Sequence, residues 1–227
     1  MKRLALLLAL APAPTLAAER NYSVTDFDRI RIEGPYEVTL ATGTNSRARA
    51  IGDQAALDRI TIEVQAGMLK IHPNRSAWGG NPGAQSGPVK IELGTRALKG
   101  VAIVGSSRLA IDTVRGLKVD LSVSGSGRLD VAAVDVDSLV LASVGAGTIA
   151  LGGTAKQLRA TVQGSAALEA EGLRTDDAIL AAETSGRIAF RTDRTARIAA
   201  NGLGEVRIAG TADCTVTGSA ADVHCGK

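Results

Sequence analysis

The sequence predicts an all-β fold, a β-helix (β-solenoid) with about 20 residues in each coil. Apolar and polar residues alternate with a period of two, as in 119–131 and 139–151, which indicates strands. A glycine-rich corner interrupts this alternation at nearly constant intervals. An apolar residue stands at the same distance after each corner, and self-similarity of this kind is typical of a solenoid.

The repeat defines a register. The first apolar residues after the corners follow one another at nearly equal steps that shorten slightly toward the C-terminus, and they are Leu109, Leu129, Ile149, Leu168, Ile188, Val206 and Val223. A second apolar position precedes each corner by four residues, at Val101, Leu121, Leu141, Ala160, Leu180, Ile198 and Cys214. We expect equivalent positions to stack about 4.8 Å apart and to form aliphatic columns inside a slim rod.

Other repeat architectures fit the pattern less well. Helical repeats are longer and need a period of 3.6, whereas leucine-rich repeats need a fixed spacing of Leu and Asn that is absent here. A hexapeptide coil needs an aliphatic residue at every sixth position. Leu109 is followed six residues later by Arg115, and Leu121 by Gly127, so this architecture is excluded.

Residues 1–18 are predicted to be a secretory signal peptide. Lys2 and Arg3 precede the apolar run Leu4–Ala11, and small residues suited to cleavage end at Ala18. No cysteine lies at the cleavage point, so we do not expect a lipid-anchored lipoprotein. We expect a periplasmic or extracellular protein with no integral membrane segment once the signal is removed.

Residues 19–94 are predicted to form an irregular N-terminal β region, and 95–227 the regular solenoid. Two pairs of alternating strands lie in 27–43 and 60–73, and they form either the first irregular coils or a small β-sheet cap. Residues 74–88 lack periodicity and are rich in Gly and Pro, which indicates a loop. This loop contains Trp78, which is either a contact residue or part of a simply disordered segment.

The two cysteines, Cys214 and Cys225, lie in the last predicted coil. In an oxidising compartment they are expected to form a disulfide that joins the two arms of this coil. By closing the loop, the bond should stabilise the fold by about 2–3 kcal/mol. The alternative is a metal site that includes His224. That site would have three ligands at most, with no second cluster to complete it.

Candidate catalytic residues are few. A sugar hydrolase needs two carboxylates across a cleft, and the acids on the solenoid that could supply them are Asp112, Asp120, Asp130, Asp135 and Asp137. They form no repeated cluster, and the only histidines are His72 and His224. We therefore predict no catalytic, cofactor-binding or metal-binding residues, no cofactor and no enzyme activity.

An outward column of charged residues is the second candidate for a contact surface. Arg108 and Arg128 are expected in adjacent coils, with Asp130 on the same side of the strand as a partner for Arg128. The column is either a solvated face or a stripe that binds an anionic polymer. Without Lys2 and Arg3 the formal charge falls from +3 to +1, so we expect no nucleic-acid partner.

The segments "FDRIRIEGPYEVTL", "LDRITIEVQAGMLKIHP" and "VSGSGRLDV" resemble the putative auto-transporter adhesin, head GIN domain family. The resemblance covers essentially the whole chain after the signal peptide. It implies a right-handed β-helix in a secreted or envelope protein of bacteria, and it carries no set of functional residues.

These observations predict a non-enzymatic, adhesin-like or scaffold binding module, whose partner is a surface polymer or an envelope protein. The alternative is a polysaccharide-active enzyme, a lyase or hydrolase, on a β-helix. A third possibility is a homo-oligomer, because the stacked coils end in strand edges that can pair with another copy.

Overall fold

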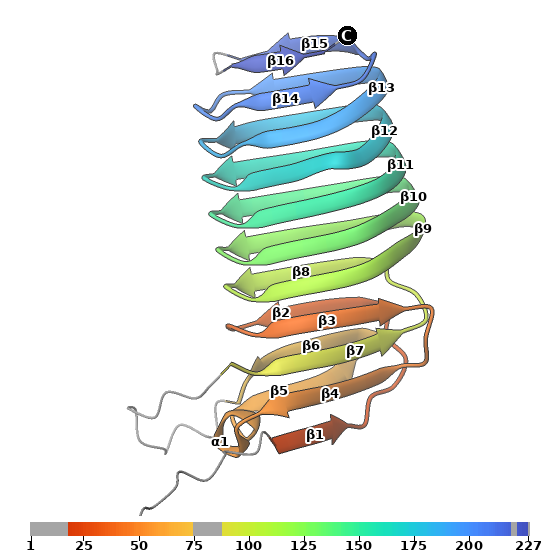
Figure 1. Ribbon diagram of the computed structural model, residues 1–227, viewed down its shortest axis with the longest axis vertical. Helices are drawn as coiled ribbons and strands as arrows, with labels where there is room; N and C mark the ends of the chain where they lie inside the picture. The colour runs from red at the N-terminus through yellow and green to blue at the C-terminus, as the bar shows by residue number, and fades with distance from the viewer. Residues whose placement is uncertain (1–17, 75–87, 219–221, 227) are drawn as a thin grey trace, which may run out of the picture.

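The computed structural model describes residues 18–74, 88–218 and 222–226. It is an elongated, nearly all-β stack of coils, with the N-terminal strands at one end and the C-terminal strands at the other (Figure 1). The predicted signal peptide, apart from Ala18, lies outside these residues. The N-terminal elements are β1 (Ala18–Tyr22), β2 (Arg29–Glu33), β3 (Glu37–Thr42), β4 (Arg47–Gly52), α1 (Gln54–Leu57), β5 (Ile60–Gln65), β6 (Met68–Pro73), β7 (Lys90–Thr95) and β8 (Gly100–Gly105).

The C-terminal elements form the regular solenoid. They are β9 (Arg108–Gly125), β10 (Arg128–Gly145), β11 (Thr148–Gly164), β12 (Ala167–Thr184), β13 (Ile188–Ala200), β14 (Val206–Ala209), β15 (Asp213–Thr217) and β16 (Val223–Cys225). Each long strand runs along one side of the rod, bends, and returns along the other side (Figure 1). We call the side that contains 108–111 and its register partners face 1, and the side that contains 118–124 and its partners face 2.

The strand register confirms the predicted coil length. Arg128–Gly145 pairs in parallel with Arg108–Gly125, and the later rows follow at the predicted intervals. The face 1 column is Leu109, Leu129, Ile149, Leu168, Ile188, Val206 and Val223, as expected. Equivalent positions of the repeat therefore lie one above the other along the rod.

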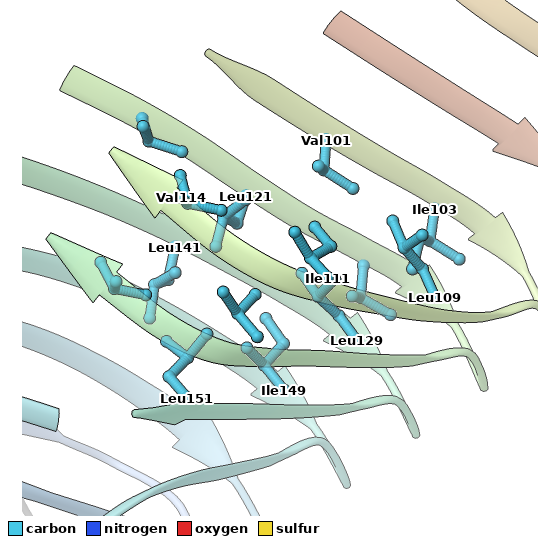
Figure 2. Close-up of a cluster of buried hydrophobic side chains, with 14 of the residues drawn as sticks. Val101, Ile103, Leu109, Ile111, Val114, Leu121, Leu129, Leu141, Ile149 and Leu151 are labelled. Atoms are coloured by element: carbon cyan, nitrogen blue, oxygen red, sulfur yellow. The ribbon is translucent and has the colours of Figure 1, made fainter. Parts of the chain in front are cut away.

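The core is a narrow aliphatic layer between the two faces. Figure 2 shows Leu109, Leu129 and Ile149 from face 1 beside Leu121 and Leu141 from face 2. These side chains are at most 2 % exposed, and burying them supplies the main driving force for folding. Large residues also stack on small ones. Phe190, for example, is 1 % exposed and pairs in register with Ala170 of the preceding row.

The prediction for Cys214 was wrong by two residues. Cys214 pairs with Ala196, whereas Val216 pairs with Ile198 and is the true end of the column that contains Leu121. The reason is that Gly218 lies against Ala200, whereas the corner of that preceding row is Gly202, two residues later. A position counted back from Gly218 is therefore two residues too early. Cys214 still points inward because a shift of two preserves the face of a strand.

The N-terminal region contains both coils and a cap. β2 and β3 form one row, yet they lie between β6 and β7 on one side and β8 and β9 on the other. The order of rows along the rod therefore differs from the order along the chain. Residues 75–87, between β6 and β7, include Trp78 and lie outside the described residues.

Antiparallel strands close the N-terminal end. β1 pairs with β4 and β4 with β7 on face 1, while β5 pairs with β6 on face 2. The short helix α1 buries Ala56 and Leu57 at this end. No helix within the described ranges is long and apolar enough to cross a membrane.

The corner glycines permit a close backbone approach between rows. Gly105, Gly125 and Gly145 have φ values of 107°, 114° and 111°, which disfavour any side chain. In three successive rows the amide that follows the corner glycine donates a hydrogen bond to the corner glycine of the row before, for example from Ala146 N to Gly125 O at 2.8 Å. A Cβ at position 145 would lie 2.7 Å from the same oxygen.

We expect Gly145→Ala to lower the free energy of unfolding by about 3 kcal/mol, because it adds a steric clash to an unfavourable backbone conformation. Gly43→Ala is the matched control, since Gly43 also has a positive φ of 70° but a Cβ there would meet nothing within 4 Å. The control should lose about 1 kcal/mol. Denaturant unfolding of the two variants checks this, and equal losses would contradict the steric argument.

One buried polar side chain departs from the aliphatic pattern. Ser143 is 1 % exposed, and its Oγ has no hydrogen-bond partner among the described residues. Its neighbours in the column are Val123 and Val162. Ser107 is also buried, but its Oγ donates a hydrogen bond to Gly34 O and accepts one from Tyr36 N at 3.2 Å.

Ser143→Val is expected to raise the free energy of unfolding by about 1 kcal/mol, because it replaces an unsatisfied hydroxyl with the side chain that its neighbours carry. The matched variant Ser107→Val should instead lose about 1–3 kcal/mol, because it leaves Tyr36 N without its acceptor. Thermal and denaturant unfolding measure both changes. A Ser143→Val protein less stable than the wild type would show that the hydroxyl has a role that the packing does not reveal.

Candidate functional site

The two predicted arginines lie side by side on face 1. Arg108 and Arg128 pair in register in adjacent rows, and both side chains point outward. The third predicted contact residue, Trp78, lies outside the described residues. The candidate site is therefore built from face 1 around the two arginines.

Arg128 is held by carboxylates. Its Nε donates to Asp130 Oδ1 at 2.9 Å, and its Nη2 lies 3.1 Å from Glu169 Oε2, which reaches across the row between them. The hydrogen bond to Asp130 is the main cause that raises the pKa of Arg128 above its ordinary value. The predicted Arg128–Asp130 pair is thus present, and carboxylates of the protein relieve the repulsion between the stacked arginines.

Arg108 differs from Arg128. No carboxylate of the described residues lies within ion-pair distance of its guanidinium group. It borders a shallow hollow of about 440 Å³ on face 1, whose floor includes the short side chains of Thr39 and Ala110. The charged residues around this hollow are Glu37, Lys90, Glu92, Arg108 and Asp130.

Lys90 and Glu92 were not predicted to be neighbours of Arg108. Glu37 pairs with both Lys90 and Arg108, and Thr39 pairs with both Glu92 and Ala110. These contacts arise because the β2–β3 row lies between β7 and β9. The irregular spacing of the N-terminal strands gave no register from which this order of rows could be found.

The candidate catalytic acids do not converge. Asp130 lies on face 1, Asp120 lies on face 2 beside Lys118, and Asp112 accepts a hydrogen bond from Thr42 N at 3.0 Å. Asp135 and Asp137 lie two residues apart near the bend. Their cationic partners come from opposite rows, Arg115 at 4.0 Å and Lys156 at 2.7 Å. Each of the five carboxylates therefore has its own partner.

The two cysteines form the predicted disulfide. Cys214 and Cys225 have Cα atoms 6.5 Å apart, and the bridge joins β15 on face 2 to β16 on face 1. It therefore closes the last coil across the core, as predicted. The bridge also removes the alternative in which both thiolates bind a metal with His224. Within the described ranges no group of three or more His, Cys, Asp and Glu residues could hold a metal ion.

Face 2 carries a group of residues that was not predicted from the sequence. Arg159, Ile179 and Arg197 occupy one outward column in three successive rows. The interval of the repeat relates them, so the signal was present in the sequence. The predicted contact stripe included only the outward column next to the corner, and these three residues lie in another column.

Comparisons with known proteins agree on the fold. The sequence profile of the family described as "putative auto-transporter adhesin, head GIN domain" matches residues 26–212. A solved structure of a putative adhesin from Bacteroides fragilis is similar with a TM-score of 0.82 and 19% sequence identity, and the match covers 95% of this chain and 99% of that chain. No protein with a curated description matches the sequence.

Two further solved structures share the fold at lower similarity. A putative lipid binding protein from Parabacteroides distasonis has a TM-score of 0.68 and 19% identity, with 93% of this chain and 98% of that chain covered. A putative adhesin from Parabacteroides merdae has a TM-score of 0.65 and 14% identity over the same shares of the two chains. At these identities the likeness shows the fold alone.

Proposed function

Because this chain belongs to the putative auto-transporter adhesin, head GIN domain family, we propose that it is a non-enzymatic binding module of the bacterial envelope or cell exterior. The disulfide supports this location, since such bonds persist in oxidising compartments. The predicted signal peptide at 1–18 belongs to the same proposal. The module would be exported and would present its solenoid to a surface polymer or an envelope protein.

The arrangement of carboxylates favours binding over catalysis. Hydrolysis of a glycosidic bond needs two carboxyl groups on opposite sides of the scissile bond, one of them protonated. Here the candidate acids are spread over both faces and the bend, and each is held by a base or a backbone amide. No pair of them is left to face a common substrate.

The observation that carries the proposal is the hollow beside Arg108 on face 1. A flat sheet face with a floor of short side chains accepts an extended polymer, and the unpaired guanidinium supplies a strong hydrogen-bond donor for an anionic group on it. Glu37 and Lys90 add an acceptor and a donor on the same hollow. We therefore centre the proposed contact site on Arg108 rather than on the whole predicted stripe.

A glycan array with the purified protein, followed by binding to intact bacterial and host cells, identifies the partner. We expect Arg108→Ala to weaken the binding about tenfold, which corresponds to about 1.4 kcal/mol. Arg187→Ala is the control, because Arg187 lies on face 1 but is paired with Glu171 at 3.2 Å. It should bind as the wild type does.

Retention of full affinity by Arg108→Ala, or by the double variant with Arg128→Ala, would rule out this site. The same preparations are incubated with acidic polysaccharides, and chain cleavage is followed by the release of reducing ends and unsaturated products. Cleavage by the wild type would favour the alternative of a polysaccharide-active enzyme.

A further inference from the structure

Two arginines without an ion-pair partner mark a second site, on face 2. From β9 onward, most Arg and Lys side chains lie within ion-pair distance of a carboxylate, as Arg174 and Arg191 do with Asp193. Arg159 and Arg197 have no such partner among the described residues. Both side chains are exposed, and they flank Ile179 in one column. Because they are two rows apart, their Cα atoms are separated by about 10 Å.

A hollow of about 350 Å³ lies along this column, between it and the outward column of Gln157, Asp177 and Thr195. It is bordered by Gln157, Arg159, Asp177, Ile179, Thr195 and Arg197. Asp177 is the one acid of this group, and its carboxylate is already engaged. Arg194 Nε lies 3.1 Å from its Oδ1, Arg194 Nη2 contacts its Oδ2, and Thr195 Oγ1 lies 2.7 Å from Oδ1. The hydrogen bond from Arg194 is the main cause that lowers the pKa of Asp177, and the charge of Arg197 contributes least.

The surface beside the arginines is partly apolar. Ile179 is 39% exposed, and the half-buried Val140 continues the arginine column in the preceding row, with Asp120 one row further along. The adjacent outward column consists of short side chains: Ser122, Ala142, Thr161, Ala181, Ala199 and Thr217. A ligand bound here would therefore meet two guanidinium groups and the exposed side chain of Ile179 at the same time.

We propose that face 2 binds the surface of a membrane that contains anionic lipids, with a phosphate group held between Arg159 and Arg197 and Ile179 against the glycerol and acyl boundary. Guanidinium groups bind phosphate through paired hydrogen bonds, and basic residues near an anionic bilayer are attracted to it. A free phosphate or a hydrated polyanion would leave Ile179 and Val140 in water. The exposed apolar side chains therefore favour the lipid surface.

This proposal goes beyond the function proposed above, since it uses the opposite face and does not depend on Arg108. If both hold, the solenoid lies on a membrane through face 2 and presents face 1 to its partner. The two proposals fail separately, because Arg108→Ala is expected to leave membrane binding unchanged.

The test is vesicle co-sedimentation of the purified protein. The vesicles are pure phosphatidylcholine or a mixture with phosphatidylglycerol, at low and high salt. The wild type should bind the anionic vesicles, less at high salt, and bind pure phosphatidylcholine weakly. Arg159→Ala and Arg197→Ala should each lower the partition constant about fivefold. Ile179→Glu should abolish binding, because it places a carboxylate between the two arginines.

The control is the double variant Arg187→Ala/Arg207→Ala, which removes the same charge from face 1, where both arginines are paired with acids. It should bind vesicles as the wild type does. Full binding by the Arg159→Ala/Arg197→Ala protein would overturn the proposal, as would equal binding to neutral vesicles. Binding to soluble dextran sulfate but not to vesicles, with loss in the same variant, would instead assign the site to a polyanion.

Discussion

The parallel pairing of each coil with the next one is the constraint on which the structure depends. A coil of this size cannot bury its own apolar side chains, so the rows above and below must cover them. In-register pairing places Leu121 between Val101 and Leu141, and it brings the corner backbones of Gly125 and Gly145 together. The repeat in the sequence follows from this geometry, because every row must satisfy the same neighbours.

The regular part could be predicted from the sequence because its coil length and its pattern of alternation define the register. Leu109, Leu129 and Ile149 were placed in one column from their spacing alone, and the structure confirms it. The N-terminal rows could not be ordered in this way. Pairing of β2 with both β6 and β8 is a contact between distant segments, and no local pattern in the sequence encodes it. Cys214 was misplaced because the last coil reaches its glycine two residues early.

The surface was harder to predict than the core, because exposed positions are free to vary. The sequence correctly placed Arg108 beside Arg128 and paired Arg128 with Asp130. Glu169, two rows away, also contacts Arg128, whereas no carboxylate of the described residues lies within ion-pair distance of Arg108. On face 2, the structure shows that the nearby carboxylate of Asp177 is engaged by Arg194 and Thr195, which leaves Arg159 and Arg197 without an ion-pair partner among the described residues. Which cations are unpaired is thus a property of the three-dimensional arrangement.

The central claim is the register of the stacked coils, and cysteine cross-linking on the exposed side of face 2 measures it directly. Ala142 and Thr161 pair in adjacent rows, so the Ala142→Cys/Thr161→Cys protein should form a disulfide readily on mild oxidation, since paired Cα atoms are about 4.8 Å apart. Ala142→Cys/Gln163→Cys shifts one partner by two residues and should not cross-link. Equal or faster cross-linking of the shifted pair would contradict the stacking on which the fold and both proposed sites depend.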